Sequence, residues 1–223
     1  NDSSATVLIT QTSKTAIVTE AIKNTPALDH ICWVGKAGRI PRKSFSHVKC
    51  HEWEDIFSRP YERLSNPKMS VIDLDVATLI YTSGSTGVPK GVVSAHYNVV
   101  AAARSIIHYL ENKEDDIILN VLPLSFDYGL YQVLMAFFFG GTVVLEKSFA
   151  YPYKIIERLV QEKVTGFPMV PTMVAILLQM KDLGGFDFSA LRYITNTAAA
   201  LPVEHIKKMQ RLLPHVRLYS MYG

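Results

Sequence analysis

Short uninterrupted runs of apolar residues alternate along the chain with longer segments in which apolar residues recur every three or four positions. Uninterrupted runs are typical of strands covered on both faces, and the longer spacing is typical of amphipathic helices. The runs predict strands at residues 7–10, 30–34, 77–81, 91–94, 117–122, 142–145, 166–168, 191–195 and 217–222, and one beginning at Val48. The helical spacing predicts helices at residues 13–23, 98–110, 130–139, 152–163, 171–181 and 202–213. Because strands and helices alternate, we expect an α/β fold of mostly parallel sheets flanked by helices on both faces.

The alternation becomes regular only after residue 67. Before it, residues 35–45 are rich in glycine, proline and basic residues and predict a loop, while residues 53–64 predict a helix interrupted at Pro60. The pair Asn66-Pro67 marks a break between the two patterns. We therefore expect two α/β subdomains, residues 1–67 and 68–223, and we expect the strand at residues 77–81 to be buried in the second.

Residues 128–145 carry no charge, and their 18 positions approach the length of a membrane-spanning helix. Gln132 and the pair Gly140-Gly141 interrupt the stretch. We therefore expect a helix, a glycine turn and a strand here, and no membrane span.

Composition and charge exclude several classes of protein. The chain has 23 Lys and Arg against 20 Asp and Glu, and a net charge of +3 is too small to indicate a nucleic-acid partner. Two cysteines are too few for a disulfide framework and favour a reduced, cytoplasmic protein. The first residues lack the basic and apolar regions of a signal peptide. His47, Cys50 and His51 lie close together, but no second ligand pair follows them, so no metal site is expected.

Residues 81–91 read Tyr-Thr-Ser-Gly-Ser-Thr-Gly-Val-Pro-Lys-Gly and lie between two predicted strands. Glycines allow positive φ and close approach to a ligand, successive backbone amides can surround an anion, and hydroxyl groups and a lysine add donors. A Walker A loop needs Ser or Thr after the lysine, and here glycine follows it. The alternative is a flexible Ser/Gly linker, but linkers seldom join two apolar strands through a Pro-Lys-Gly ending. The loop therefore predicts phosphate binding.

The same eleven residues resemble the signature loop of the superfamily that contains AMP-forming acyl-CoA synthetases, peptide-synthetase adenylation domains and luciferases. Further segments resemble motifs of this superfamily in the expected order: His96-Tyr97-Asn98, Leu122-Pro123-Leu124-Ser125-Phe126-Asp127, Thr197-Ala198-Ala199-Ala200-Leu201-Pro202 and Tyr219-Ser220-Met221-Tyr222-Gly223. The similarity is clear from about residue 77 to residue 223 and weaker before it. The resemblance implies part of the N-terminal domain of such an enzyme, with the C-terminal domain absent.

The resemblance also implies a two-step reaction. A carboxylic acid or amino acid attacks the α-phosphorus of ATP with Mg²⁺ to give acyl-AMP and pyrophosphate, and the acyl group then passes to CoA or to the phosphopantetheine of a carrier protein. Thr82 and Lys90 are implied to assist catalysis by holding charge on the leaving pyrophosphate. The residues implied to hold the phosphates are Thr82, Ser83, Gly84, Ser85, Thr86, Gly87 and Lys90. The residues implied to hold adenine are Ala198, Ala199, Ala200, Tyr222 and Gly223.

Several of these residues also have an ordinary structural explanation. Phe126 and Asp127 match the acyl pocket, where an aspartate in peptide synthetases pairs with the ammonium group of an amino acid, but Asp127 also fits a helix cap. His96 is implied to line the substrate site, yet a histidine at a helix start is often structural. The alanines at residues 198–200 fit a loop packed after a strand, and Tyr222 fits a buried strand tyrosine.

The sequence stops just before the Thr-Glu pair whose glutamate the resemblance implies for Mg²⁺. We therefore expect an internal fragment that on its own binds nucleotide poorly and catalyses little. Two other functions remain open: a non-catalytic nucleotide-binding module, and an oxidoreductase of the luciferase type that starts from the same adenylate.

Overall fold

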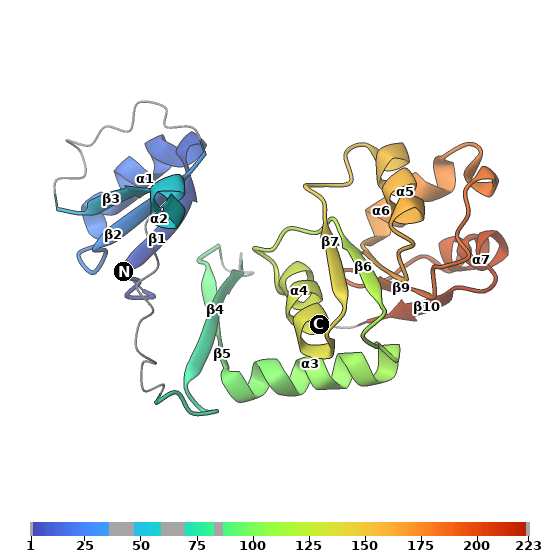
Figure 1. Cartoon of the computed structure of the whole chain (residues 1–223), viewed down its shortest axis with the longest axis horizontal. Helices are drawn as coiled ribbons and strands as arrows, with labels where there is room; N and C mark the ends of the chain where they lie inside the picture. Colours follow the sequence, from blue (N-terminus) through green and yellow to red (C-terminus); the bar gives the residue numbers. More distant parts are fainter. Residues whose placement is uncertain (1, 36–46, 59–69, 83–86, 222–223) are drawn as a thin grey trace. The chain divides into compact units, whose positions relative to one another are not determined.

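The computed structural model describes residues 2–35, 47–58, 70–82 and 87–221 (Figure 1). The chain divides into two compact units, Asn1–Val71 and Ile72–Gly223. The loop expected at residues 35–45 lies almost wholly outside the described residues, as does the part of the expected helix 53–64 that follows residue 58.

The first unit is built around a parallel three-stranded sheet in the order β1-β2-β3. Its strands are β1 (Val7–Gln11), β2 (His30–Val34) and β3 (Lys49–Glu52), and its α-helices are α1 (Thr15–Ala21) and α2 (Trp53–Ser58). Short 3-10 turns, η1 (Thr12–Lys14) and η2 (Ile22–Asn24), extend α1 at both ends. Val18 and Ile22 pack on Ile31 and Trp33 of the central strand, which gives this small unit its own apolar core.

The second unit begins with an antiparallel hairpin of β4 (Val76–Thr82) and β5 (Lys90–Ala95), and α3 (His96–Leu110) follows directly. The expectation of a buried strand at residues 77–81 is wrong. Leu79 is 38% exposed and Tyr81 41% exposed. Among the described residues the hairpin forms a two-stranded sheet of its own, so no further strand shields its side chains.

The rest of the second unit is a parallel five-stranded sheet whose strands alternate with helices. Its elements, in chain order, are β6 (Ile117–Asn120), α4 (Asp127–Phe139), β7 (Thr142–Leu145), α5 (Pro152–Gln161), β8 (Gly166–Met169), α6 (Pro171–Gln179), η4 (Leu183–Gly185), β9 (Tyr193–Asn196), α7 (Val203–Leu212) and β10 (Arg217–Ser220). The strands lie in the order β10-β9-β8-β6-β7. This arrangement confirms the mostly parallel α/β fold expected from the alternating pattern.

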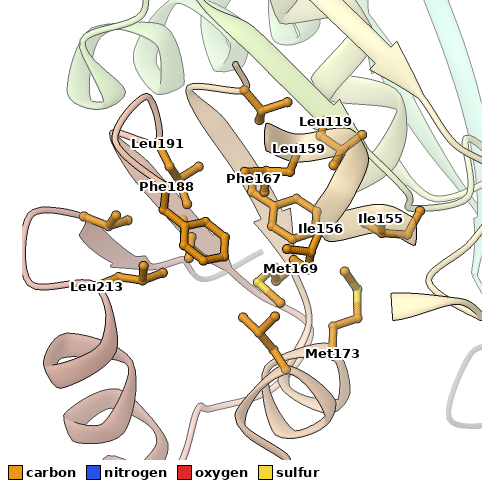
Figure 2. Close-up of a cluster of buried hydrophobic side chains, with 14 of the residues drawn as sticks. Leu119, Ile155, Ile156, Leu159, Phe167, Met169, Met173, Phe188, Leu191 and Leu213 are labelled. Carbon is orange, nitrogen blue, oxygen red and sulfur yellow. The ribbon is translucent and has the colours of Figure 1, made fainter. Parts of the chain in front are cut away.

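Helices cover both faces of this sheet. On one face, Leu110 of α3 and Phe139 of α4 pack with Ile118 and Tyr193. The larger core lies on the other face, where α5, α6 and α7 pack on β6, β8 and β9, and Figure 2 shows Ile156, Phe167 and Met169 among its side chains. All residues of β8 and β9 are buried, which explains why these strands read as uninterrupted runs.

The uncharged stretch 128–145 folds as the sequence indicates. Helix α4 ends at Phe139, Gly140 takes a left-handed conformation with φ of 80°, and β7 follows. In the part of the chain that the structure describes, no helix has both the length and the apolar character needed to cross a membrane.

A buried carboxylate stabilises the amino-terminal ends of the central strands. The side chain of Asp116 is fully buried and pairs with Arg192, whose Nε donates to Oδ1 at 3.0 Å. Thr165 Oγ1 donates to Oδ1 at 2.7 Å, and Asn112 Nδ2 and the Lys113 amide donate to Oδ2 at 3.1 and 3.0 Å. Burial alone raises the pKa of Asp116, but these hydrogen bonds, led by the one from Arg192, hold the pKa below its usual value.

Candidate functional site

The connections of the large sheet mark the place where a ligand is expected. From β6 the chain passes through α4 to β7 on one side, and then returns through α5 to β8 on the other side of β6. Neighbouring parallel strands whose connections diverge in this way form a crevice beyond their carboxyl ends, where open α/β sheets bind ligands. We call the ends of β6, β8, β9 and β10 at Asn120, Met169, Asn196 and Ser220 the carboxyl edge.

Asn120 fixes the start of the connection from β6 to α4. This residue is buried, its Nδ2 donates to the Gly129 carbonyl at 3.1 Å, and its Oδ1 accepts from the Leu122 amide at 3.1 Å. A Cβ added to Gly129 would lie 2.4 Å from the Pro123 carbonyl oxygen. Close backbone contact and two hydrogen bonds therefore hold the first turn of α4 against the end of β6.

Phe126 and Asp127 lie where this connection meets α4. Phe126 is 63% exposed and occupies the N-cap position without a capping side-chain bond. The helix begins three residues earlier than its apolar spacing predicts, so Asp127 is its exposed first residue and not its cap. The Tyr128 amide donates to Asp127 Oδ1 at 2.7 Å. A carboxylate in the first turn is favoured by the helix dipole, and its exposure leaves it available to a cationic group.

Tyr128 turns inward from the same helix start. Its hydroxyl lies 2.6 Å from Thr195 Oγ1 on β9. Burial raises the pKa of Tyr128 far above its usual value, although the hydrogen bond with Thr195 acts in the opposite direction, so the hydroxyl stays protonated. Sequence reasoning did not find this pair, because the two residues lie 67 positions apart and neither belongs to a local pattern.

The turn at residues 197–202 follows β9 at the carboxyl edge. Ala198 has a φ of 72°, which is uncommon for a residue with a side chain. Asn196 Nδ2 donates to the Ala199 carbonyl at 3.1 Å and so fixes the turn. Residues 198–200 are exposed, and their small side chains leave the backbone open to a flat ligand.

A small cavity opens beside this turn. It has a volume of 70 Å³, and its lining includes Asn196, Leu201, Tyr219 and Ser220. Asn196 Oδ1 is buried and has no hydrogen-bond partner among the described residues. An unpaired buried acceptor is costly unless a donor reaches it, so this position fits an amino group such as that of adenine.

The hairpin brings together the two residues expected to assist catalysis. Thr82 and Lys90 are direct partners in the antiparallel register, at the end of the hairpin from which residues 83–89 extend. Gly87 has a φ of 80°, and a Cβ added to it would meet no other described atom within 4 Å, as expected for a loop that approaches a ligand closely. Lys90 is exposed. The expected phosphate contacts Ser83, Gly84, Ser85 and Thr86 lie outside the described residues.

His96 is placed apart from this pair. It is the exposed first residue of α3 and follows the opposite end of β5 from Lys90. Six residues of extended strand separate the two by about 20 Å. The hairpin therefore does not bring the imidazole to the expected phosphate contacts.

Among the described residues, no group of three or more His, Cys, Asp or Glu side chains could hold a metal ion. The other residues expected at the nucleotide, Tyr222 and Gly223, lie outside the described part of the chain.

Comparisons with known proteins show that the chain is similar to adenylate-forming enzymes. The family model described as AMP-binding enzyme matches residues 1–223. The 4-coumarate–CoA ligase-like 6 of Arabidopsis thaliana is 33% identical over 166 residues, covering 70% of this chain and 29% of that protein. A linear gramicidin synthase of Brevibacillus parabrevis is 30% identical over 178 residues, covering 79% of this chain and 2% of that protein. The chain thus spans less than a third of the length of these curated relatives.

Solved structures share the fold. The O-succinylbenzoate coenzyme A synthetase from Bacillus subtilis, in complex with AMP, matches with a TM-score of 0.76 at 22% identity, covering 96% of this chain and 43% of that chain. VinN with L-aspartate matches with a TM-score of 0.72 at 24% identity, covering 97% of this chain and 62% of that chain.

Proposed function

Because this chain belongs to the family of AMP-binding enzymes, we propose that the complete natural protein activates a carboxylate with ATP. A carboxylate oxygen forms a bond to the α-phosphorus while the bond from that phosphorus to the bridging oxygen breaks. The electron pair leaves with pyrophosphate, and the other product is acyl-AMP. The observation that carries this proposal within the chain is the hairpin in which Thr82 and Lys90 are paired at the start of a glycine-containing loop.

The hairpin is proposed to stabilise the leaving pyrophosphate. Negative charge grows on the bridging oxygen as the bond breaks, and donors already held in place stabilise such charge without reorganising. We assign this role to the Lys90 ammonium group, the Thr82 hydroxyl and residues 83–87 of the loop between them. Magnesium, when bound, would neutralise phosphate charge.

The carboxyl edge is proposed to hold the rest of the substrates. The turn at residues 197–202 would receive adenine, because its small side chains leave room for a flat base and Asn196 Oδ1 offers an unpaired acceptor. We assign Tyr222 and Gly223 to the same base from the resemblance alone. Phe126 and Asp127 would contact the acyl substrate.

The nature of the acyl substrate and its acceptor forms a second part of the proposal. The relatives named above include a CoA ligase and a gramicidin synthase, so either CoA or a carrier-bound phosphopantetheine would serve as the thiol. The exposed Asp127 carboxylate favours an amino acid, whose ammonium group it would pair with. A fatty or aryl acid would leave Asp127 with a helix-dipole role only.

The first experiment is exchange of pyrophosphate into ATP by the complete protein, tested with panels of amino, aryl and fatty acids. Strong exchange with one class would support adenylation and identify the substrate class. If amino acids are preferred, Asp127→Ala should abolish that preference. Asp55→Ala is the matched control, because Asp55 is an exposed aspartate in the first turn of α2. Folded protein that binds ATP and exchanges with no acid would contradict the proposal and indicate a non-catalytic nucleotide-binding module.

A further inference from the structure

The two segments assigned to the acyl group and to adenine are joined through the part-buried side chain of Tyr128. Tyr128 follows Asp127 at the start of α4, and its hydroxyl reaches Thr195 at 2.6 Å near the carboxyl end of β9. Thr195 is 2% exposed, and the next residue, Asn196, donates to Ala199 within the turn at residues 197–202. Two hydrogen bonds, together with the covalent backbone from Thr195 to Asn196, thus connect the acyl side of the carboxyl edge to the adenine side.

Neighbouring contacts hold both Tyr128 and strand β9 in place. Gln132 is buried, and its Nε2 donates to the Tyr128 carbonyl at 3.0 Å, so the tyrosine is fixed by its backbone as well as by its hydroxyl. All four residues of β9 are buried. A shift of the first turn of α4 must therefore either move the end of β9 with it or break the hydrogen bond to Thr195.

We propose that Tyr128 is a positioning residue whose hydrogen bond to Thr195 couples the segment Phe126-Asp127 to the turn at residues 197–202, so that the carboxylate and the nucleotide bind cooperatively. This inference rests on the proposed function for the identity of the two ligands. The mechanical link between the segments does not depend on it. Because coupling between two sites is reciprocal, the carboxylate tightens ATP binding by the same factor by which ATP tightens carboxylate binding.

The size of the effect follows from the bond that carries it. A neutral buried hydrogen bond contributes about 1 kcal/mol net, which corresponds to roughly a fivefold change in an equilibrium constant. Removing it should reduce the mutual tightening of the two ligands by about that factor.

The chain supplies a close control for Tyr128→Phe. Tyr193 lies on β9 as well, is 2% exposed, and its hydroxyl accepts one hydrogen bond from Asn112 Nδ2 at 2.9 Å. It stands at the amino-terminal end of the strand, away from the carboxyl edge. Tyr193→Phe therefore removes a comparable buried hydrogen bond without touching the proposed link. Thr195→Val removes the same hydrogen bond as Tyr128→Phe, because it deletes the hydroxyl group of the other partner.

The first measurement is amide hydrogen exchange of the ligand-free complete protein. The reporter is the Met221 amide, which donates to the Asn196 carbonyl at 2.8 Å at the base of the turn. Tyr128→Phe and Thr195→Val should each speed its exchange by about fivefold, the double variant should add nothing further, and Tyr193→Phe should leave it unchanged. Equal exchange of the Met221 amide in Tyr128→Phe and Tyr193→Phe would overturn the proposal, whether or not the protein is an adenylating enzyme.

The second measurement is calorimetric binding of α,β-methylene-ATP with and without the carboxylate that best supports pyrophosphate exchange. In the unmodified protein and in Tyr193→Phe, the carboxylate should tighten nucleotide binding by the same factor. In Tyr128→Phe and Thr195→Val, that factor should fall by about fivefold. An unchanged factor in both would overturn the proposal. If the variants change amide hydrogen exchange but the protein catalyses no pyrophosphate exchange with any acid, the link between the two segments is supported and the proposed function is rejected.

Discussion

Asp116 offers the sharpest test of what holds the large sheet together. Asp116→Asn keeps the shape of the side chain but removes its charge, and it places an amide donor among groups that already donate. Arg192, whose side chain is 31% exposed, would lose its ionic partner. Breaking a fully buried pair costs about 3 to 5 kcal/mol, and the partial exposure of Arg192 lowers this to about 2 to 4 kcal/mol. For a unit of this size, the melting temperature should fall by roughly 5 to 15 °C.

The pH dependence of this loss has a definite sign. The folded state lowers the pKa of Asp116 below its ordinary value of 3.8, so the unfolded chain binds its proton first as the pH falls. The stabilisation is therefore fully present well above that value and is lost as the pH falls through the folded pKa. The stability difference between the unmodified protein and Asp116→Asn should be largest near about pH 7 and shrink towards about pH 3.

The assay uses the location of the tryptophans. Both tryptophans of the chain, Trp33 and Trp53, lie in the first unit, so their fluorescence during urea unfolding reports on that unit. Far-ultraviolet circular dichroism also follows the helices of the second unit, where the loss should appear. Asp115→Asn is the control, because Asp115 is exposed and its ion pair with Lys113 contributes little. The reasoning would be refuted if both variants were equally stable, or if the loss did not depend on pH.

Two further substitutions test the first turn of α4 and the hairpin. Gly129→Ala should lower the free energy of unfolding by about 1 to 3 kcal/mol, because the added Cβ would meet the Pro123 carbonyl. The control is Gly184→Ala, whose added Cβ has no described atom within 4 Å and which should be nearly neutral in the same thermal melt. Lys90→Ala should slow pyrophosphate exchange by about 100-fold without changing stability. The control Lys14→Ala, in the first unit, should leave the exchange rate unchanged. Equal exchange rates in these two variants would show that Lys90 is not part of the phosphate site.

Much of the fold could be predicted because its signals are local. The strands at residues 30–34 and 142–145 were predicted with the bounds that the structure gives them, since each is a short apolar run ended by a glycine or a change of pattern. The proline-started helices were found for the same reason, because proline at the first turn loses no helical hydrogen bond.

What could not be predicted depends on contacts between distant residues. Leu79 is exposed because no further described strand pairs with the hairpin. The apolar pattern of a strand does not show which other strands will lie beside it. The partners Asp116 and Arg192 are 76 positions apart, and no local motif links them. Phosphate binding by residues 81–91 was predicted from the loop composition and the resemblance, and it stays a prediction because part of that loop lies outside the described residues.

The order of strands in the large sheet also has a consequence for how the molecule comes to exist. The seam between β6 and β8 joins Ile117 to Thr165, which are 48 residues apart, whereas partners elsewhere in the sheet are separated by roughly half that distance along the chain. Closing a longer loop carries a larger entropic cost, so β6 should pair with β7 before it pairs with β8. The crevice lies across that seam. A newly synthesised chain would therefore form the proposed ligand site only after β7 has joined β6, and a ligand that binds there would stabilise the completed sheet.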